Sequence, residues 1–66
     1  MTDLMTDRLL RIAQVMEISG LSKAMIYRLE REGKFPRHCK PGGASTRWSE
    51  REVREWHAAV LANRAA

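Results

Sequence analysis

Apolar residues recur at helical spacing in two neighbouring stretches of the first half of the chain. Gly20 lies between them and suits the left-handed backbone that often follows a helix end. Ser22 follows, with a hydroxyl that can cap the next helix. The pattern predicts a first helix over about residues 13–18, a tight turn, and a second helix over about residues 22–32 that ends at Gly33.

The second predicted helix has two different faces. At about 100° per residue, three apolar side chains fall together and are expected to face inward: Met25, Ile26 and Leu29. The other face carries basic residues, a tyrosine and a small residue: Lys23, Ala24, Tyr27, Arg28 and Arg31. Long hydrogen-bond donors and a small residue that permits close approach are what a DNA-recognition helix requires. An ordinary amphipathic surface helix shows a similar pattern, but an exposed tyrosine among cations favours contact with sugar and phosphate.

Two short helices joined by a glycine turn predict a helix-turn-helix. In that motif the second helix enters the DNA major groove and the first crosses the backbone. The apolar and turn positions of the motif hold suitable residues: Val15, Gly20, Leu21, Ile26 and Leu29. Met16 stands where a small residue is usual, one turn before the glycine, and is expected to loosen the packing of the two helices.

A wing is predicted over about residues 37–48. Its centre, Pro41-Gly42-Gly43, has strong turn chemistry, and short strands are expected on either side. A ribbon with a glycine-rich tip can lie flat against a phosphate backbone, where Lys40 and Arg47 would pair with it. A bare surface loop would carry the same turn residues.

A third helix is predicted after Ser49, which begins a capping box with Glu52. Four residues recur along one face of this helix and are expected to pack on the first two helices: Val53, Trp56, His57 and Val60. Trp48 and Trp56 would supply much of the apolar area that a small core needs, and Phe35 an apolar anchor before the wing.

These elements predict a mainly α fold with a small β-hairpin, namely a single winged helix-turn-helix domain of three helices plus a wing. With 66 residues, the chain has room for one domain and a modest core. We expect a disordered tail over residues 1–8, the DNA-binding domain over 9–62 and a frayed end over 63–66. Residues 8–11 are expected to form a short extended segment that leads into the first helix.

The net charge of +4 is concentrated in the middle of the chain. Residues 23–47 hold seven basic and two acidic side chains, whereas the remainder holds five basic and six acidic ones. A basic centre between near-neutral ends suits a phosphate backbone. A solvated basic surface is the plain alternative, and the coincidence with the helix-turn-helix favours DNA.

Other chemistries find little support in the sequence. Cys39 is the only cysteine, which excludes an internal disulfide and suits a reducing cytoplasm. No apolar run reaches a membrane span and the first residues do not resemble a signal peptide, so we expect a cytoplasmic protein without membrane contact. His38, Cys39 and His57 are too sparse for a structural zinc site. We therefore expect no metal, no cofactor and no catalytic residues.

The chain resembles the AlpA family of small prophage transcriptional regulators, which are related to excisionases and to the DNA-binding part of MerR-type proteins. The resemblance covers about residues 8–60 and is most specific at Ile26-Tyr27-Arg28 followed by Gly33-Lys34-Phe35-Pro36, with Gly42-Gly43 before Arg47-Trp48 as support. It implies a nucleoid-associated protein when bound to DNA. It also implies that Lys23, Ala24, Tyr27, Arg28 and Arg31 face the major groove, and that residues 40–47 face the adjacent groove or backbone.

The leading hypothesis is a sequence-specific binder of double-stranded DNA that acts as a transcription regulator, a recombination directionality factor (excisionase), or both. The expected contact residues are Ser22, Lys23, Ala24, Tyr27, Arg28, Arg31, Lys40 and Arg47. One small domain offers few base contacts, so self-association on repeated sites is expected, with an integrase or RNA polymerase as possible partners. The alternative is a protein-interaction adaptor or anti-repressor that uses its third helix. A nucleic-acid enzyme is a distant third.

Overall fold

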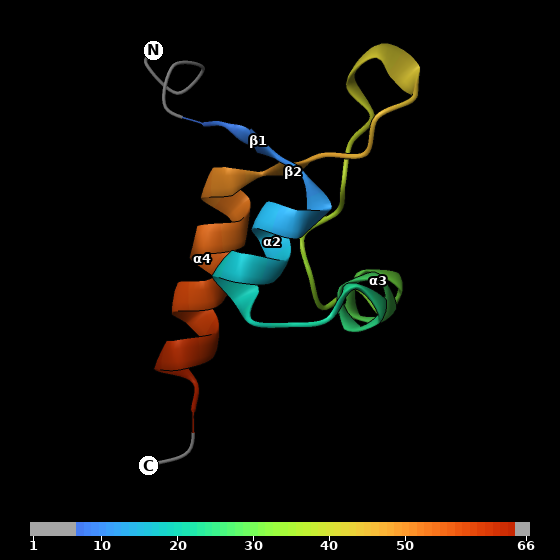
Figure 1. Ribbon diagram of the computed structural model, residues 1–66. Coiled ribbons are helices and arrows are strands. Elements are labelled where there is room, and N and C mark those ends of the chain that lie inside the picture. Colours follow the sequence, from blue (N-terminus) through green and yellow to red (C-terminus); the bar gives the residue numbers. More distant parts are fainter. Residues whose placement is uncertain (1–6, 65–66) are drawn as a thin grey trace.

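The computed structural model describes residues 7–64. Along this part of the chain, the elements follow in the order β1 (Leu9–Leu10), α2 (Ile12–Ser19), α3 (Lys23–Arg31), a 3-10 turn (Pro41–Gly43), β2 (Trp48–Ser49) and α4 (Glu50–Ala62). In Figure 1, α2 lies between α4 on one side and α3 on the other, and the loop around the 3-10 turn projects above α3, at the top right of the view. The architecture is mainly α, as the sequence predicts.

The turn between α2 and α3 forms as expected. Gly20 has φ of 74°, in the left-handed region, and its N–H donates to the carbonyl of Met16 at 2.9 Å. Ser22 then caps α3, because its hydroxyl accepts the N–H of Met25 at 3.2 Å. Met16 is half-buried and packs against the core. The two helices and their turn are therefore a helix-turn-helix.

The strands β1 and β2, the helices α2, α3 and α4 and the segment after α3 contribute to one small core. Its buried side chains are Leu10, Val15, Ile26, Phe35, Trp48 and Val53. Phe35 is therefore the anchor that the sequence predicts. Met25 and Val60 were expected to face inward, but they remain 36% and 47% exposed. Helical spacing places both residues near the apolar side, but Met25 lies in the first turn of α3 and Val60 in the last turn of α4, at helix ends that the core does not cover.

The fold contains two short antiparallel pairings, one between β1 and β2 and one at the base of the wing. In the β1–β2 sheet, Leu9 pairs with Ser49 and Leu10 with Trp48. The wing closes at one bridge, where Cys39 and Arg47 exchange backbone hydrogen bonds of 2.7 and 2.9 Å. The wing is thus a ribbon with the shortest possible stem, and the fold is that of a winged helix-turn-helix.

The first turn of α4 is held by residues from the start of the chain. Asp7 accepts the N–H of Arg51 at 3.0 Å and the hydroxyl of Ser49 at 2.8 Å, and Arg8 pairs with Glu50 at 3.0 Å. Ser49 in turn accepts the N–H of Glu52 at 3.2 Å, the serine half of the predicted capping box. The tail expected over residues 1–8 therefore includes two residues that dock on α4, while residues 1–6 lie outside the described range.

At the other end, α4 finishes at Ala62. The frayed end expected over residues 63–66 falls partly beyond the described residues, which stop at Arg64. No helix within residues 7–64 combines the length and the apolar character needed to cross a bilayer.

Candidate nucleic-acid interface

The outer face of α3 presents most of the side chains that the sequence nominates. Lys23, Ala24, Arg28 and Arg31 are all exposed. Arg28 is 62% exposed and lies 3.2 Å from the carboxylate of Glu32, one turn along the helix. This pair orients the guanidinium along the helix surface while leaving donors free for a ligand. Ser22 is exposed at the start of the same face, with its hydroxyl engaged in the cap.

Tyr27 departs from the expectation that it points outward. It is half-buried against the core, with its ring 5.8 Å from that of Trp48 and 6.5 Å from that of His38, both in edge-to-face geometry. The sequence places Tyr27 on the polar side of α3, but it packs against His38 from the segment after α3 and Trp48 from β2. Its ring therefore forms a wall beside the exposed cations.

Glu30 is a residue of this region that the sequence analysis missed. It is only 9% exposed, and one carboxylate oxygen lies 2.6 Å from both the backbone N and the ring Nδ1 of His38. The carboxylate thus anchors the segment after α3 onto the helix. The available signal was spacing, since Glu30 follows the buried Ile26 by one helical turn.

The wing tip lies on the same side of the molecule as α3 and away from α4 and the C-terminus (Figure 1). Residues 40–45 are all exposed. Gly42 and Gly43 adopt φ of 77° and 90°, which L side chains rarely tolerate, so the tight tip depends on these glycines. Lys40 is fully available, whereas Arg47 is half-buried and donates from Nη1 to the carbonyl of Thr46 at 2.9 Å.

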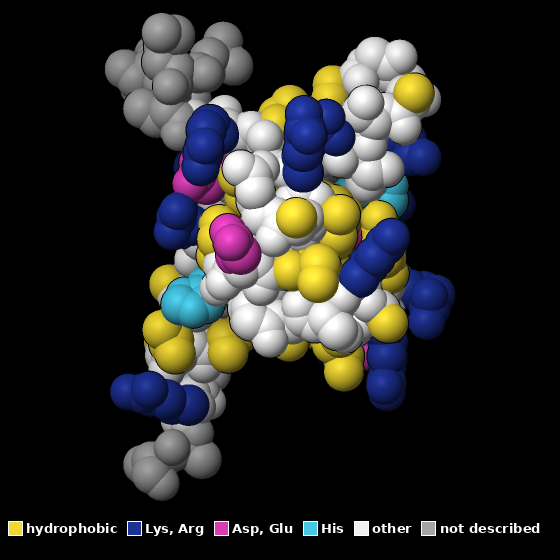
Figure 2. Space-filling model, in the orientation of Figure 1, with side chains coloured by type: hydrophobic (Ala, Val, Ile, Leu, Met, Phe, Trp, Pro, Cys, Tyr) yellow, Lys and Arg dark blue, Asp and Glu magenta, His cyan; other side chains and the backbone are white. Residues whose placement is uncertain are grey.

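The charge of this side is largely uncompensated. Dark-blue cationic side chains line the edge of the molecule where α3 runs (Figure 2). Four of its exposed cations have no acidic partner within residues 7–64: Lys23, Arg31, Arg37 and Lys40. A cluster of unpaired cations beside a protruding glycine loop is suited to a polyanion.

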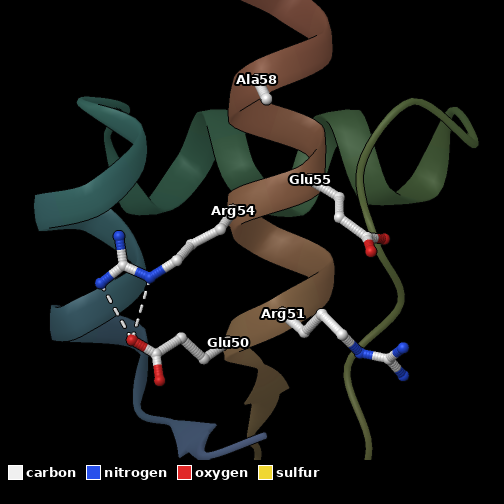
Figure 3. A pocket seen from close by; sticks show the side chains of 5 residues that line it. All are labelled: Glu50, Arg51, Arg54, Glu55 and Ala58. Atoms are coloured by element: carbon white, nitrogen blue, oxygen red, sulfur yellow. Dashed lines mark hydrogen bonds and ion pairs between the residues drawn. The ribbon is translucent and has the colours of Figure 1, made fainter. Parts of the chain in front are cut away.

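The outer face of α4 is different in kind. A hollow of about 480 Å³ is lined there by Glu50, Arg51, Arg54, Glu55 and Ala58. Figure 3 shows Arg54 reaching back to Glu50, and the two lie 2.9 Å apart. Hydrogen bonds from Arg8 and Arg54 lower the pKa of Glu50. Carboxylates and guanidiniums balance on this face, so it is an ion-paired, solvated surface.

The described residues contain no cluster of side chains that could bind a metal ion. Within residues 7–64, no three His, Cys, Asp or Glu side chains come close enough to hold a metal ion together. Cys39 is a free, exposed thiol at the wing stem.

Comparison with known proteins agrees with this geometry. An uncharacterized protein of Enterobacteria phage P4, ORF88, is 40% identical over 62 residues, which are 94% of this chain and 70% of the phage protein. None of the solved structures matches the chain. The sequence model of the prophage CP4-57 regulatory protein (AlpA) matches residues 8–61, which include both helices of the helix-turn-helix, the wing and nearly all of α4. The chain therefore belongs to the AlpA family of prophage regulatory proteins, which makes it a DNA-binding regulator.

Proposed function

We propose that this protein binds specific sites on double-stranded DNA with α3 in the major groove and the wing tip on the adjacent backbone or minor groove. The observation that carries the proposal is the joint position of the unpaired cations of α3 and the exposed wing tip on one side of the molecule. The opposite side, on α4, is charge-balanced. A duplex approaching the domain would therefore be drawn to one face only.

Residues at the start of α3 are the best placed to read bases. Recognition helices contact base edges with their N-terminal residues. In α3 these are Ser22, Lys23 and Ala24, and the methyl side chain of Ala24 lets the helix approach closely. Arg28 follows one turn later on the same exposed face. Its guanidinium suits a guanine edge, because Arg can donate two parallel hydrogen bonds to it.

In this proposal Lys40 and Arg47 lie near the DNA backbone, but Lys40 contributes more to binding than Arg47 does. Lys40 is exposed at the edge of the tip, and it would neutralise one phosphate. Arg47 has already committed part of its guanidinium to Thr46, so its contribution is mainly to the wing stem. Both roles leave base reading to α3.

Binding of this kind would serve transcription control, excision of a prophage, or both. A single domain with few base contacts gains specificity when several copies occupy repeated sites. An integrase or RNA polymerase would then be recruited or excluded by the assembled copies. A reporter downstream of the selected site detects the first activity, and an excision substrate with the cognate integrase detects the second.

The direct test is selection of a site from a randomised duplex pool, followed by affinity measurements over a salt series. Arg28→Ala should weaken binding to the selected site by about 1–3 kcal/mol. Arg54→Ala is a matched control, since Arg54 is 61% exposed and also has an ion pair one helical turn away, but on α4. Wild-type affinity should fall steeply with salt because phosphate contacts release counterions.

Weak affinity at every salt concentration would overturn the proposal. It would favour the adaptor alternative, in which α4 is the ligand, since Val60 and Leu61 are exposed near its end. Equal effects of Arg28→Ala and Arg54→Ala on the selected site would reject α3 as the reading helix.

A further inference from the structure

A second hollow lies between the C-terminal half of α3 and the segment that leads to the wing. It has a volume of about 380 Å³ and is lined by Tyr27, Glu30, Arg31, Arg37 and His38. The first three side chains come from α3, and the last two from the segment after it. The hollow is therefore made where two pieces of backbone are fixed against each other.

Glu30 fixes this arrangement from within. Its carboxylate accepts the backbone N–H of His38 at 2.6 Å and lies 2.6 Å from Nδ1 of the same residue. A carboxylate oxygen accepts hydrogen bonds, so the Nδ1–H of His38 donates to Glu30 and this contact fixes the orientation of the ring. The His38 ring also packs edge-to-face against Tyr27 and Trp48. Both the backbone and the ring of His38 are thus held in place.

The charge around the opening is positive. Arg31 and Arg37 are exposed, and neither has an acidic partner in the described part of the chain. Glu30 is only 9% exposed, and its carboxylate accepts hydrogen bonds from His38 inside the protein. It therefore offsets little of the positive charge at the opening. Two unpaired guanidiniums beside an aromatic wall form a site for an oxyanion, because Arg donates paired hydrogen bonds that match phosphate oxygens.

We propose that this hollow, the phosphate seat, binds one backbone phosphate at the edge of the major groove through Arg31 and Arg37, with His38 and Tyr27 as its wall. The inference rests on the proposed function, since it requires α3 to lie in the groove. With the start of α3 at the base edges, its C-terminal half passes close to a backbone strand. In this arrangement Arg31 contacts the DNA backbone and not the bases, and Arg37 and His38 become part of the DNA-binding surface. Glu30 is a positioning residue.

The phosphate seat can be tested by removing one charge from each partner. Duplexes of the selected site would carry a neutral methylphosphonate at one position at a time, and each would be titrated with wild type, Arg37→Ala and Arg64→Ala. Arg37 is exposed and makes no side-chain hydrogen bond within residues 7–64, so its variant should melt like wild type. Arg64 is an exposed cation beyond the end of α4 and provides the charge-matched control.

Wild type should lose roughly tenfold in affinity when the phosphate in the seat is neutralised. Arg37→Ala should lose roughly tenfold in affinity for the unmodified duplex. Neutralising the phosphate in the seat should then lower the affinity of this variant almost no further, because the substitution in the protein and the one in the DNA remove the same contact. At other contacted phosphates it should lose as much as wild type does. Arg64→Ala should follow wild type throughout.

Additive losses at every position would overturn the phosphate seat while leaving DNA binding by α3 intact. If Arg37→Ala bound the unmodified duplex as tightly as wild type does, the phosphate seat would also be overturned. Absence of DNA binding by wild type would overturn the proposed function and the seat together, so the two failures are distinguishable.

Discussion

The indole N–H of Trp56 donates a hydrogen bond to the backbone carbonyl of Lys34, with an Nε1–O distance of 2.9 Å. The same ring meets Phe35 edge-to-face at a centroid distance of 4.7 Å. The loop that follows α3 is therefore fastened to α4 by one side chain that is itself only half-buried. Through this contact, α4 holds the segment that runs from α3 towards the wing.

Trp56→Ala should destabilise the domain by about 2–3 kcal/mol, less than a fully buried Trp and still a large share of the stability of a small domain. Trp48→Ala removes a side chain that is 0% exposed and should prevent folding altogether. Trp56→Phe keeps the ring contact but loses the hydrogen bond, so its loss should be about 1 kcal/mol. Denaturant melts rank the three variants. An unchanged melt for Trp56→Ala would show that this contact contributes nothing.

Tyr27 should prove to be a structural residue with a smaller part in binding. Tyr27→Ala removes a ring packed on Trp48 and His38 and should cost about 2 kcal/mol of stability. Tyr27→Phe retains the ring, so its melt should match wild type. Any DNA affinity that Tyr27→Phe loses then belongs to the hydroxyl and should not exceed about 1.5 kcal/mol. A stable Tyr27→Ala variant would place the ring in solvent and contradict the packing.

Glu30→Ala should destabilise the domain by about 1–3 kcal/mol, since it leaves the backbone N–H of His38 without its acceptor in a part-buried place. Glu30→Gln keeps an acceptor oxygen and should lose less. Glu32→Ala is the control, because Glu32 is a neighbouring carboxylate whose ion pairs with Arg28 and Lys34 are exposed. Chemical denaturation would measure all three. Equal losses at positions 30 and 32 would contradict the anchoring role of Glu30.

The two wing cations should differ in their effect on DNA affinity. Lys40→Ala should weaken binding equally on selected and random duplexes and lower the salt slope by about one unit, as expected for one lost phosphate contact. Arg47→Ala should change the slope less and the melting temperature more, because it removes a half-buried side chain at the wing stem that donates a hydrogen bond to the carbonyl of Thr46. Affinity against salt, with a melt run in parallel, separates the two effects. Unchanged slopes for both variants would remove the wing from the interface.

Acid should loosen the docking of the chain start on α4. The N–H of Arg51 and the hydroxyl of Ser49 lower the pKa of Asp7, and the guanidiniums of Arg8 and Arg54 lower that of Glu50. Carboxylates with a depressed pKa in the folded state stabilise it above their unfolded pKa, and this contribution is lost as the pH falls through the folded one. The melting temperature should therefore decline below about pH 4–5.

The variants Asp7→Asn and Glu50→Gln should each make that decline shallower, because each removes one titrating group. Their melting temperatures at neutral pH should lie below that of wild type, and the difference should close at low pH. Parallel pH profiles for variants and wild type would show that neither carboxylate is responsible.

Local chemistry explains what the sequence could predict. The cap at Ser22, the left-handed turn at Gly20 and the serine at the start of α4 each depend on neighbours a few residues away, and all three form. Tyr27 was misplaced and Glu30 was missed, because their partners Trp48 and His38 come from the far side of the wing and from the segment before it. Asp7 contacts Ser49 and Arg51, which lie 42 and 44 positions later in the sequence. Such long-range pairings leave no periodic trace in one sequence.

The wing stem also has a consequence for how this protein can change. Cys39 and Arg47 close the loop with one backbone bridge, and the residues between Lys40 and Ser45 are all exposed. A different tip can therefore be exchanged at this junction, longer or more basic, while the three helices keep every contact they have. The backbone contact that we propose for the wing tip therefore depends on residues outside the core, so the tip can change in length or charge without altering the packing of the helices.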